Sequence, residues 1–223
     1  MLKRVQSDIF EASSSFVHLQ NFADDVLSSK MGNLQKQNIL EIGAKYFSFH
    51  SNRSSPETLV CNESQLPFSA TFDIVKSSLN LHLSKDPRGA LQQMVAVLKP
   101  RGQLFLSCFG HHSLFEWRSI FLKDDIPCGL IDFINPGLLE TWLPASGERH
   151  LTQEWVTLSF PKIEDFLHQL KSINLAKPKF GHPPLSFKTF QKACQDFNSA
   201  PSQKLSFQIL FLIYTKPYIL QDE

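Results

Sequence analysis

Small and polar residues cluster at two points where the sequence predicts that buried strands end. The apolar pair Ile74–Val75 leads into Ser77–Asn80, and the apolar run Leu104–Leu106 leads into Ser107–Gly110. Hydroxyl and amide groups at such positions can hold a small ligand through hydrogen bonds. In parallel sheets ligands bind beyond the carboxyl ends of the strands, so these two segments are the first candidates for a functional site.

Two adjacent histidines, His111 and His112, follow the second of these strand ends and could act as metal ligands or as a general base. A metal site needs more ligands at a suitable spacing, and none is recognisable near the pair. The four cysteines are far apart and form no C-x-x-C motif, which favours reduced, mostly buried thiols and a cytosolic setting. No Ser-His-Asp arrangement, phosphate loop or carboxylate pair supports another enzyme class. We therefore predict no metal and name no catalytic acid or base.

A predicted helix connects the two strands. Asp86 can cap its free N–H groups, Pro87 suits its first position, and apolar residues recur at helical spacing as far as Leu98. The segment 99–102 stops this helix. A strand, a crossover helix and a second strand without polar alternation indicate parallel strands buried on both faces, and hence an α/β fold.

Two segments of this region resemble the class I methyltransferases, which use S-adenosylmethionine (AdoMet). Residues 98–102 (LKPRG) are similar to the LKPGG turn before their fifth strand, and residues 78–82 (SLNLH) to the exit of their fourth strand. The longer segment 109–118 is most similar to the biotin-pathway malonyl-[acyl-carrier protein] O-methyltransferases, and their mitochondrial relatives in complex I assembly look nearly as close. The resemblance implies a Rossmann-like sheet, AdoMet as cofactor, and a malonyl thioester on acyl carrier protein as methyl acceptor.

The segment 38–43 (NILEIG) resembles the cofactor motif of this family, an acidic residue followed by G-x-G-x-G. Glycine serves there because the backbone turns sharply and comes close to the ligand. Lys45 and Phe47 stand at the second and third glycine positions, and the Lys45 ammonium could contact the methionine carboxylate in place of backbone N–H groups. Asn62 stands where the family has an acid that meets the adenine amine, although it could equally be a turn residue. The resemblance implies cofactor contacts from Glu41, Gly43, Lys45, Asn62 and Ser78.

Only 14 residues separate Gly43 from the next predicted strand, Thr58–Cys61. One β-α-β unit takes about 30 residues, so this interval is too short for the two helices and the second strand that the family places there. The second-strand carboxylate that grips the ribose hydroxyls has no clear counterpart, and Glu57 is a weak substitute. We therefore expect a shortened parallel sheet, with either a pruned cofactor lobe or an empty site.

The resemblance also implies three residues on the acceptor side: Phe16, His82 and Arg118. Phe16 belongs to an N-terminal arm, residues 1–30, whose apolar periodicity predicts helices with a break near Ser13–Ser15. A Phe in the core of an amphipathic helix is the alternative interpretation. Arg118 could hold an acidic acceptor or could have a structural role.

The last third of the chain predicts a strand at 154–160, in which Val156, Leu158 and Phe160 form the buried face, and then a helical insert at 161–204. A final apolar strand at 205–214 is expected to run antiparallel to the strand at 154–160. The insert carries seven lysines and only three acidic residues. A solvated helix face is one interpretation of these lysines. A docking surface for an acidic acyl carrier protein is the other, because complementary charge steers such encounters.

With 223 residues and 42% hydrophobic content, the chain can bury one sizeable core, so we predict a single domain and expect a monomer. A net charge of +1 gives no electrostatic case for nucleic acid or membrane, and no apolar run suggests a signal peptide or a membrane span. The sequence thus predicts a cytoplasmic AdoMet-dependent O-methyltransferase that acts on a malonyl thioester of acyl carrier protein, early in biotin synthesis. A non-catalytic homologue that binds a carrier or another partner is the alternative.

Overall fold

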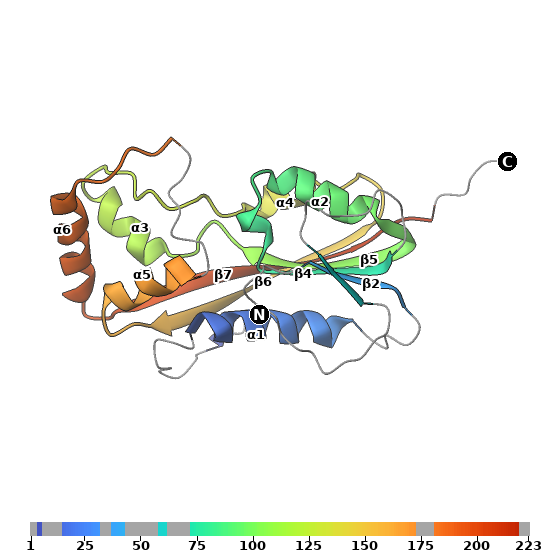
Figure 1. The fold of residues 1–223 in the computed structure, drawn as a ribbon, viewed down its shortest axis with the longest axis horizontal. Helices are drawn as coiled ribbons and strands as arrows, with labels where there is room; N and C mark the ends of the chain where they lie inside the picture. Colours follow the sequence, from blue (N-terminus) through green and yellow to red (C-terminus); the bar gives the residue numbers. More distant parts are fainter. Residues whose placement is uncertain are drawn as a thin grey trace. The chain divides into compact units, whose positions relative to one another are not determined.

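The computed structural model describes residues 4–5, 15–31, 37–42, 58–61, 72–172 and 181–218 (Figure 1). The chain divides into two compact units. Unit 1 comprises residues 1–19, 109–133 and 154–209, and unit 2 comprises residues 20–108, 134–153 and 210–223. Three long strands, β5, β6 and β7, contribute residues to both units. The single domain expected from the sequence stays a prediction.

The described elements are, in chain order, β1 (Arg4–Val5), α1 (Ser15–Lys30), β2 (Ile39–Ile42), β3 (Thr58–Cys61), β4 (Phe72–Ser78), the 3₁₀-helix η3 (Leu81–Leu83), α2 (Pro87–Ala96), β5 (Leu98–Phe109), α3 (Phe115–Leu122), α4 (Pro136–Thr141), β6 (Glu148–Ser159), α5 (Ile163–Ser172), α6 (Phe187–Asn198) and β7 (Lys204–Thr215).

Unit 2 is built on a sheet whose strands lie in the order β3-β2-β4-β5-β7-β6. The neighbours among β3, β2, β4 and β5 are parallel. β7 runs antiparallel to β5: Arg101 donates its N–H to Lys216 O, and the Gln103 side chain donates to Thr215, so numbers rise along one strand as they fall along the other. The α/β fold class predicted from the sequence is confirmed. Within the described residues the parallel part of the sheet has four strands, with β3 directly beside β2.

The crossover between β4 and β5 follows the sequence signals closely at its start. The Asp86 side chain accepts the N–H of Gly89, and Pro87 occupies the first turn of α2. The end differs from the prediction, because α2 stops at Ala96 and residues 99–102 are part of β5 rather than a separate turn. Arg101, at a φ of 66°, lies in this stretch, where the pairing with β4 shifts register. The polar residues at 99–102 predicted the end of a helix and a turn. The structure instead has an irregularity within β5 at this place.

Helices cover both faces of the unit 2 sheet: α2 and α4 lie on one face and α1 on the other (Figure 1). Buried apolar residues of α2, α4 and the central strands form one cluster, which agrees with the apolar runs Leu104–Leu106 in β5 and Ile209–Ile213 in β7. On the other face, the Phe22 ring of α1 contacts Phe211 of β7 edge-on, with ring centroids 6.2 Å apart.

Unit 1 pairs β1, β6 and β7 and carries α3, α5 and α6. Phe160 donates its N–H to Gln203 O just beyond the ends of β6 and β7, and the Thr157 and Ser206 hydroxyls lie 3.2 Å apart, so the predicted antiparallel pairing is confirmed. β6 begins at Glu148, well before the predicted strand. Its first residues are mostly polar and exposed or half-buried, so they lack the apolar alternation on which the prediction rested.

Two sequence expectations for unit 1 need correction. Arg4 and Val5 form a strand beside Trp155 and Val156, whereas the sequence predicted helix throughout the N-terminal arm. The expected break near residues 13–15 lies mostly outside the described residues, and α1 begins at Ser15. Helix α6 is amphipathic as predicted, but Phe187 at its start is 79% exposed. The sequence pattern could identify an apolar face of this helix, but not which of its residues other elements cover.

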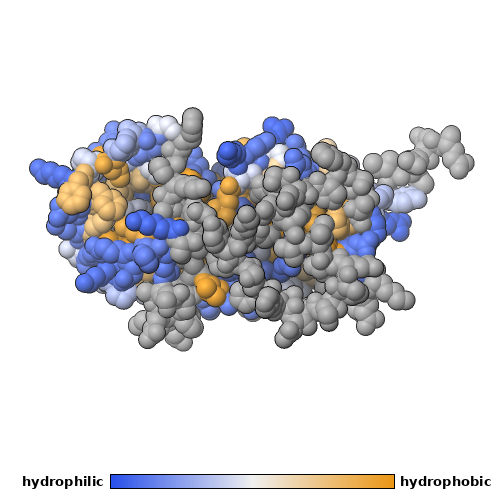
Figure 2. Space-filling view, viewed as in Figure 1, coloured by the Kyte–Doolittle hydropathy of each residue, from blue (hydrophilic) through white to orange (hydrophobic). Residues whose placement is uncertain are grey.

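Hydrophobic side chains reach the surface over α3 and α6, as Figure 2 shows. The large apolar residues exposed on these two helices are Phe115, Leu122, Phe187 and Phe190. Across the ranges that the structure describes, no helix combines the length and the apolar character that crossing a bilayer requires.

Candidate functional site

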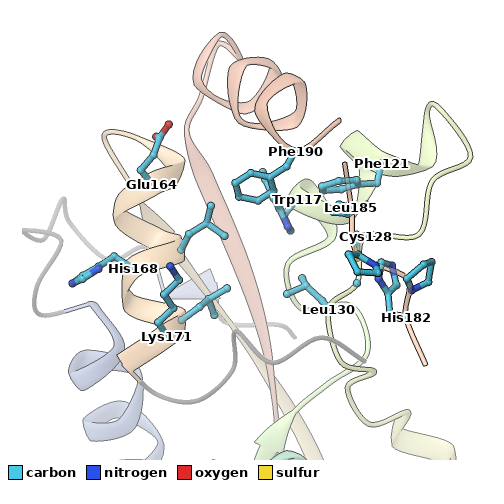
Figure 3. Close-up of a pocket in the computed structure, with 15 residues that line it drawn as sticks. Trp117, Phe121, Cys128, Leu130, Glu164, His168, Lys171, His182, Leu185 and Phe190 are labelled. Carbon is cyan, nitrogen blue, oxygen red and sulfur yellow. The ribbon is translucent and has the colours of Figure 1, made fainter. Parts of the chain in front are cut away.

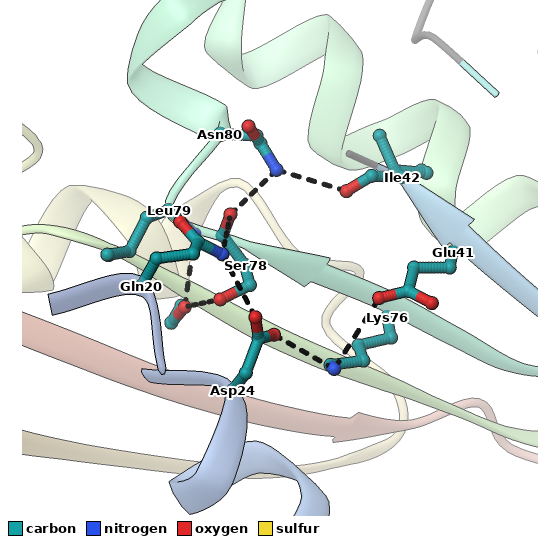
Figure 4. Close-up of polar contacts among 9 residues, drawn as sticks. Gln20, Asp24, Glu41, Ile42, Lys76, Ser78, Leu79 and Asn80 are labelled. Carbon is teal, nitrogen blue, oxygen red and sulfur yellow. Dashed lines mark hydrogen bonds and ion pairs between the residues drawn. The ribbon is translucent and has the colours of Figure 1, made fainter. Parts of the chain in front are cut away.

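The candidate site lies in unit 2, at the edge of the sheet where β2, β4 and β5 end (Figure 4). The strand register sets Ile42 opposite Ser77, and Ser78 opposite Ser107. The polar strand exits at Ser78 and Ser107 are therefore neighbours, as expected for parallel strands. This edge is where a parallel α/β sheet binds its ligands.

Ser78, a predicted cofactor contact, is only 5% exposed. Its Oγ lies 3.2 Å from Ser107 Oγ, and the Leu79 N–H donates to the same Ser107 oxygen at 3.1 Å. Leu79 has a φ of 49°, a left-handed conformation that is uncommon for non-glycine residues, and the contacts with Ser107 hold it there. In this structure Ser78 shapes the edge, and a direct contact with a cofactor stays a prediction.

Asn80 bridges the ends of β2 and β4. Its Nδ2 donates to Ile42 O at 3.1 Å and to Ser78 O at 2.6 Å, and the residue is 8% exposed. Leaving such buried carbonyl groups without donors would cost free energy, so the bridge stabilises both strand ends. The sequence placed Asn80 at a polar exit but did not predict the bridge, because Asn80 and Ile42 are 38 residues apart.

A cluster of charged residues occupies one face of this edge. Lys76 Nζ lies 2.9 Å from Asp24 Oδ1 and 3.5 Å from Glu41 Oε1. Gln20 Nε2 donates to Asp24 Oδ2 and to Ser78 O, both at 3.3 Å, which ties α1 to the exit of β4 (Figure 4). Glu41, a predicted cofactor contact, keeps 37% of its side chain exposed. Its carboxylate is therefore accessible next to the end of β2.

Gln20, Asp24 and Lys76 were not among the residues singled out from the sequence. A weak signal existed, because Gln20 and Asp24 are polar residues one helical turn apart on a helix with a buried apolar face. Lys76 follows the apolar pair Ile74–Val75 in a mostly buried strand, and a charge at such a position is usually paired or functional.

His82, predicted on the acceptor side, is a buried residue of η3 in unit 2. Burial lowers its pKa to about 3, so the imidazole is neutral at physiological pH. A neutral imidazole can donate one hydrogen bond and accept another, but it carries no charge that would attract an anionic methyl acceptor.

Arg118, also predicted on the acceptor side, lies in unit 1. Its Nη2 donates to Ile131 O at 2.8 Å, and its guanidinium lies over the Phe133 ring, 5.4 Å from the centroid. These contacts fix the segment after α3, which supports the structural alternative for Arg118. Gly43, Lys45 and Asn62 lie outside the described residues, and so does the side chain of Phe16.

The histidine pair lies in unit 1, with ring centroids 3.8 Å apart, and His112 stacks on Trp155 at 6.4 Å. Burial, and then the neighbouring His112, lower the pKa of His111. In the part of the chain that the structure describes, no three His, Cys, Asp or Glu side chains come together as a potential metal site.

Comparison with known proteins agrees with the geometry. Residues 33–106, which include β2 to β4, α2 and most of β5, match the family described as "Methyltransferase domain". The crystal structure of BH2331 from Bacillus halodurans, described as "a putative methyltransferase", superposes with a TM-score of 0.58 at 14% identity, over 87% of this chain and 98% of that one. The YcgJ protein of Bacillus subtilis superposes with a TM-score of 0.54 at 11% identity, over 91% of this chain and 100% of that one. The chain has a class I methyltransferase fold.

Two groups of relatives are similar to this chain in sequence. The malonyl-[acyl-carrier protein] O-methyltransferase of Magnetococcus marinus is 24% identical over 66% of this chain and 55% of its own length. The mitochondrial arginine-hydroxylase NDUFAF5 of Danio rerio is 27% identical over 96% of this chain and 66% of its own length, and the mouse protein is 37% identical over 38% and 27%. The chain thus spans about half of the first relative and less of the mouse one.

Proposed function

We propose that this chain is an AdoMet-dependent methyltransferase whose cofactor binds at the carboxyl edge of β2 and β4 in unit 2. The observation that carries the proposal is the position of Glu41, an accessible carboxylate at the end of β2, inside the segment that matches the methyltransferase domain. The cofactor supplies a methyl group on a sulfonium. The carboxyl end of parallel strands is where a sheet of this kind binds its ligands.

Glu41 fits this role because its carboxylate is only partly engaged. Lys76 lies 3.5 Å away, a long ion pair, and more than a third of the side chain is exposed. The free oxygen can accept a hydrogen bond from the ammonium group of the methionine part of AdoMet. Ser78, Ser107 and Asn80 would contribute indirectly by holding the strand ends in place. The other proposed contacts are Gly43, Lys45 and Asn62.

As acceptor we propose the malonyl carboxylate of a thioester on acyl carrier protein, early in biotin synthesis. The name of the Magnetococcus marinus relative supports this acceptor, as does the name of a "Biotin biosynthesis bifunctional protein BioHC" from Cellvibrio japonicus, 23% identical over 71% of this chain. A malonyl carboxylate is already ionised at neutral pH, so its oxygen could take the methyl group without a general base. The methyl–sulfur bond would break, and the sulfur would leave as a neutral thioether. The protein then needs to align the reactants and exclude water, which can lower a barrier by about 7–11 kcal/mol. A neutral His82 is compatible with this chemistry. The cytoplasmic location stays a prediction.

Two observations favour alternatives. The Danio rerio relative, whose match covers most of this chain, is named for arginine hydroxylation, so an arginine side chain should be tested beside the malonyl thioester. A non-catalytic homologue is favoured by the sequence itself, since Lys45 and Phe47 replace two glycines of the cofactor motif. Both alternatives retain the fold and differ in what the edge of the sheet binds.

Calorimetric titration with AdoMet tests the proposal. We expect binding in the micromolar range, about −8 kcal/mol. Lys45→Ala and Glu41→Gln should each weaken it by ~1.5–3 kcal/mol, as expected for a hydrogen bond to a charged group. Glu148→Gln, an exposed residue of β6, is the matched control and should leave the affinity unchanged. If folded protein gives no heat and Phe47→Gly does not restore binding, the chain is a non-catalytic homologue.

A further inference from the structure

Unit 1 contains a cavity of about 560 Å³ that the methyl-transfer proposal does not use. It is a partly open pocket lined by α3, α5 and α6 together with the segments 128–130 and 182–185, all within unit 1 (Figure 3). Its volume is in the range of pockets that enclose a small organic ligand.

The walls of this cavity are mainly apolar. Trp117 and Phe121 from α3 meet edge-on with centroids 5.1 Å apart, and Leu167 and Leu170 face them from α5. Phe190 of α6 completes the aromatic part of the wall. The ring of Trp117 is also held by Phe197 behind it, at 6.2 Å. Such a wall favours a ligand with a sizeable apolar body.

One side of the cavity is built from a close contact between two loops. His182 Nε2 lies 3.0 Å from Pro127 O, and the His182 ring covers Gly129. A Cβ on Gly129 would lie 3.1 Å from that ring, and Gly129 has a φ of +73°, so this approach needs glycine. The wall is therefore formed by the fold before any ligand binds, which limits the entropy lost on binding.

The lining holds two charged side chains of opposite sign, Lys171 and Glu164, which differ in their partners. Lys171 from α5 is exposed at the lining and forms no ion pair with any residue that the structure describes. His168 points away from the aromatic wall (Figure 3). The carboxylate among the lining residues, Glu164, accepts a hydrogen bond from Asn198 Nδ2 at 3.1 Å. An available ammonium beside an apolar cavity favours a ligand that carries one negative charge.

We propose that this cavity binds an unbranched monocarboxylic acid of the fatty-acid type. The hydrocarbon chain lies between Trp117, Phe190 and Leu167, and the carboxylate meets Lys171. This site is separate from the AdoMet edge of unit 2, so the proposal does not depend on methyl transfer.

The experiment uses the full chain and compares two probes, decanoate and decanol, by calorimetric titration. They share a chain length and differ in charge, so the comparison isolates the carboxylate. Leu167→Trp fills the cavity from a half-buried position and should abolish binding of both probes. Leu122→Trp is the matched control, because Leu122 is 72% exposed and outside the lining, and it should bind like the native protein.

Lys171→Gln should lower the affinity for decanoate about three-fold to five-fold, as for a partly exposed ion pair, and leave the affinity for decanol unchanged. Lys162→Gln, an exposed lysine outside the lining, should change neither affinity. Melting temperatures close to the native value would show that each variant is folded. The proposal is overturned if decanoate does not bind the native protein, if Leu167→Trp binds it normally, or if decanol binds as tightly as decanoate.

Discussion

The ammonium of Lys76 lies 2.9 Å from the carboxylate of Asp24 and joins α1 to β4 at the candidate cofactor edge. Only 12% of the Lys76 side chain and 24% of the Asp24 side chain are exposed. The same ammonium is 3.5 Å from Glu41. One lysine thus pairs with two carboxylates, and it holds Glu41 in place while leaving that side chain partly exposed.

Replacing Lys76 with Met should destabilise the protein by about 1–3 kcal/mol, because it leaves half-buried carboxylates without their partner. Lys99 offers a matched control: it pairs with Asp73 at 3.0 Å, but the two side chains are 38% and 33% exposed. Lys99→Met should therefore cost about 0–1 kcal/mol. Urea unfolding followed by circular dichroism measures both. Equal losses for the two variants would contradict a special role for Lys76.

The buried His82 should make stability depend on pH. Its pKa falls from 6.5 to about 3 on folding, because burial disfavours the charged ring. Between these values the unfolded chain binds a proton that the folded chain does not, so stability decreases as the pH falls through this window, by up to about 1.4 kcal/mol per pH unit. Above pH 6.5 both states are neutral and the effect disappears.

His82→Gln removes the imidazole that takes up this proton in the unfolded chain. Its free energy of unfolding, measured by urea titration at several pH values between 4 and 7.5, should fall less steeply towards acid than that of the native protein. Parallel curves for the two proteins would mean that His82 is not buried in its neutral form.

The thiols should differ in reactivity. Burial raises the pKa of Cys108 to about 12, and burial, followed by the nearby Glu164, raises that of Cys194. Cys128 is less buried than either. Because the thiolate is the reactive form, brief treatment with iodoacetamide should label Cys128 well before Cys108 or Cys194. Peptide mass spectrometry identifies the labelled sites, and urea-unfolded protein is the control in which all four cysteines of the chain react. Rapid labelling of Cys108 in the native protein would contradict its burial.

Much of the fold could be predicted because local signals and hydrophobic pattern agree. Asp86 and Pro87 mark the start of α2, and the apolar runs at 39–42 and 205–214 correspond to β2 and β7. The boundary of β5 could not be predicted in this way. Lys99-Pro100-Arg101-Gly102 reads as a turn, but pairing with neighbouring strands incorporates it into the sheet.

The polar arrangement at the candidate site was harder to predict. Motif resemblance identified Glu41 and Ser78 but gave no indication of Lys76, whose partners come from β2 and from a helix far away in sequence. The hydrogen bond from Asn80 to Ile42 O likewise joins two segments that are far apart in the sequence. Residue patterns report periodicity within a segment, and such contacts form only when the segments pack together.

The insert lysines provide the test of the proposed carrier partner. Lys192 already binds Asp124 at 2.6 Å, so Lys162 and Lys188, both exposed, are the better probes. If an acidic acyl carrier protein docks here, the double variant Lys162→Glu/Lys188→Glu should weaken its binding about five-fold to thirty-fold, an effect of one or two kcal/mol being of this size. The salt dependence of binding should also flatten, because exposed charges are screened by salt. Lys85→Glu, an exposed lysine of unit 2, is the control and should have little effect. Unchanged affinity of the double variant in a titration at low salt would remove the carrier partner from the proposal, and AdoMet binding would still be decided by its own titration.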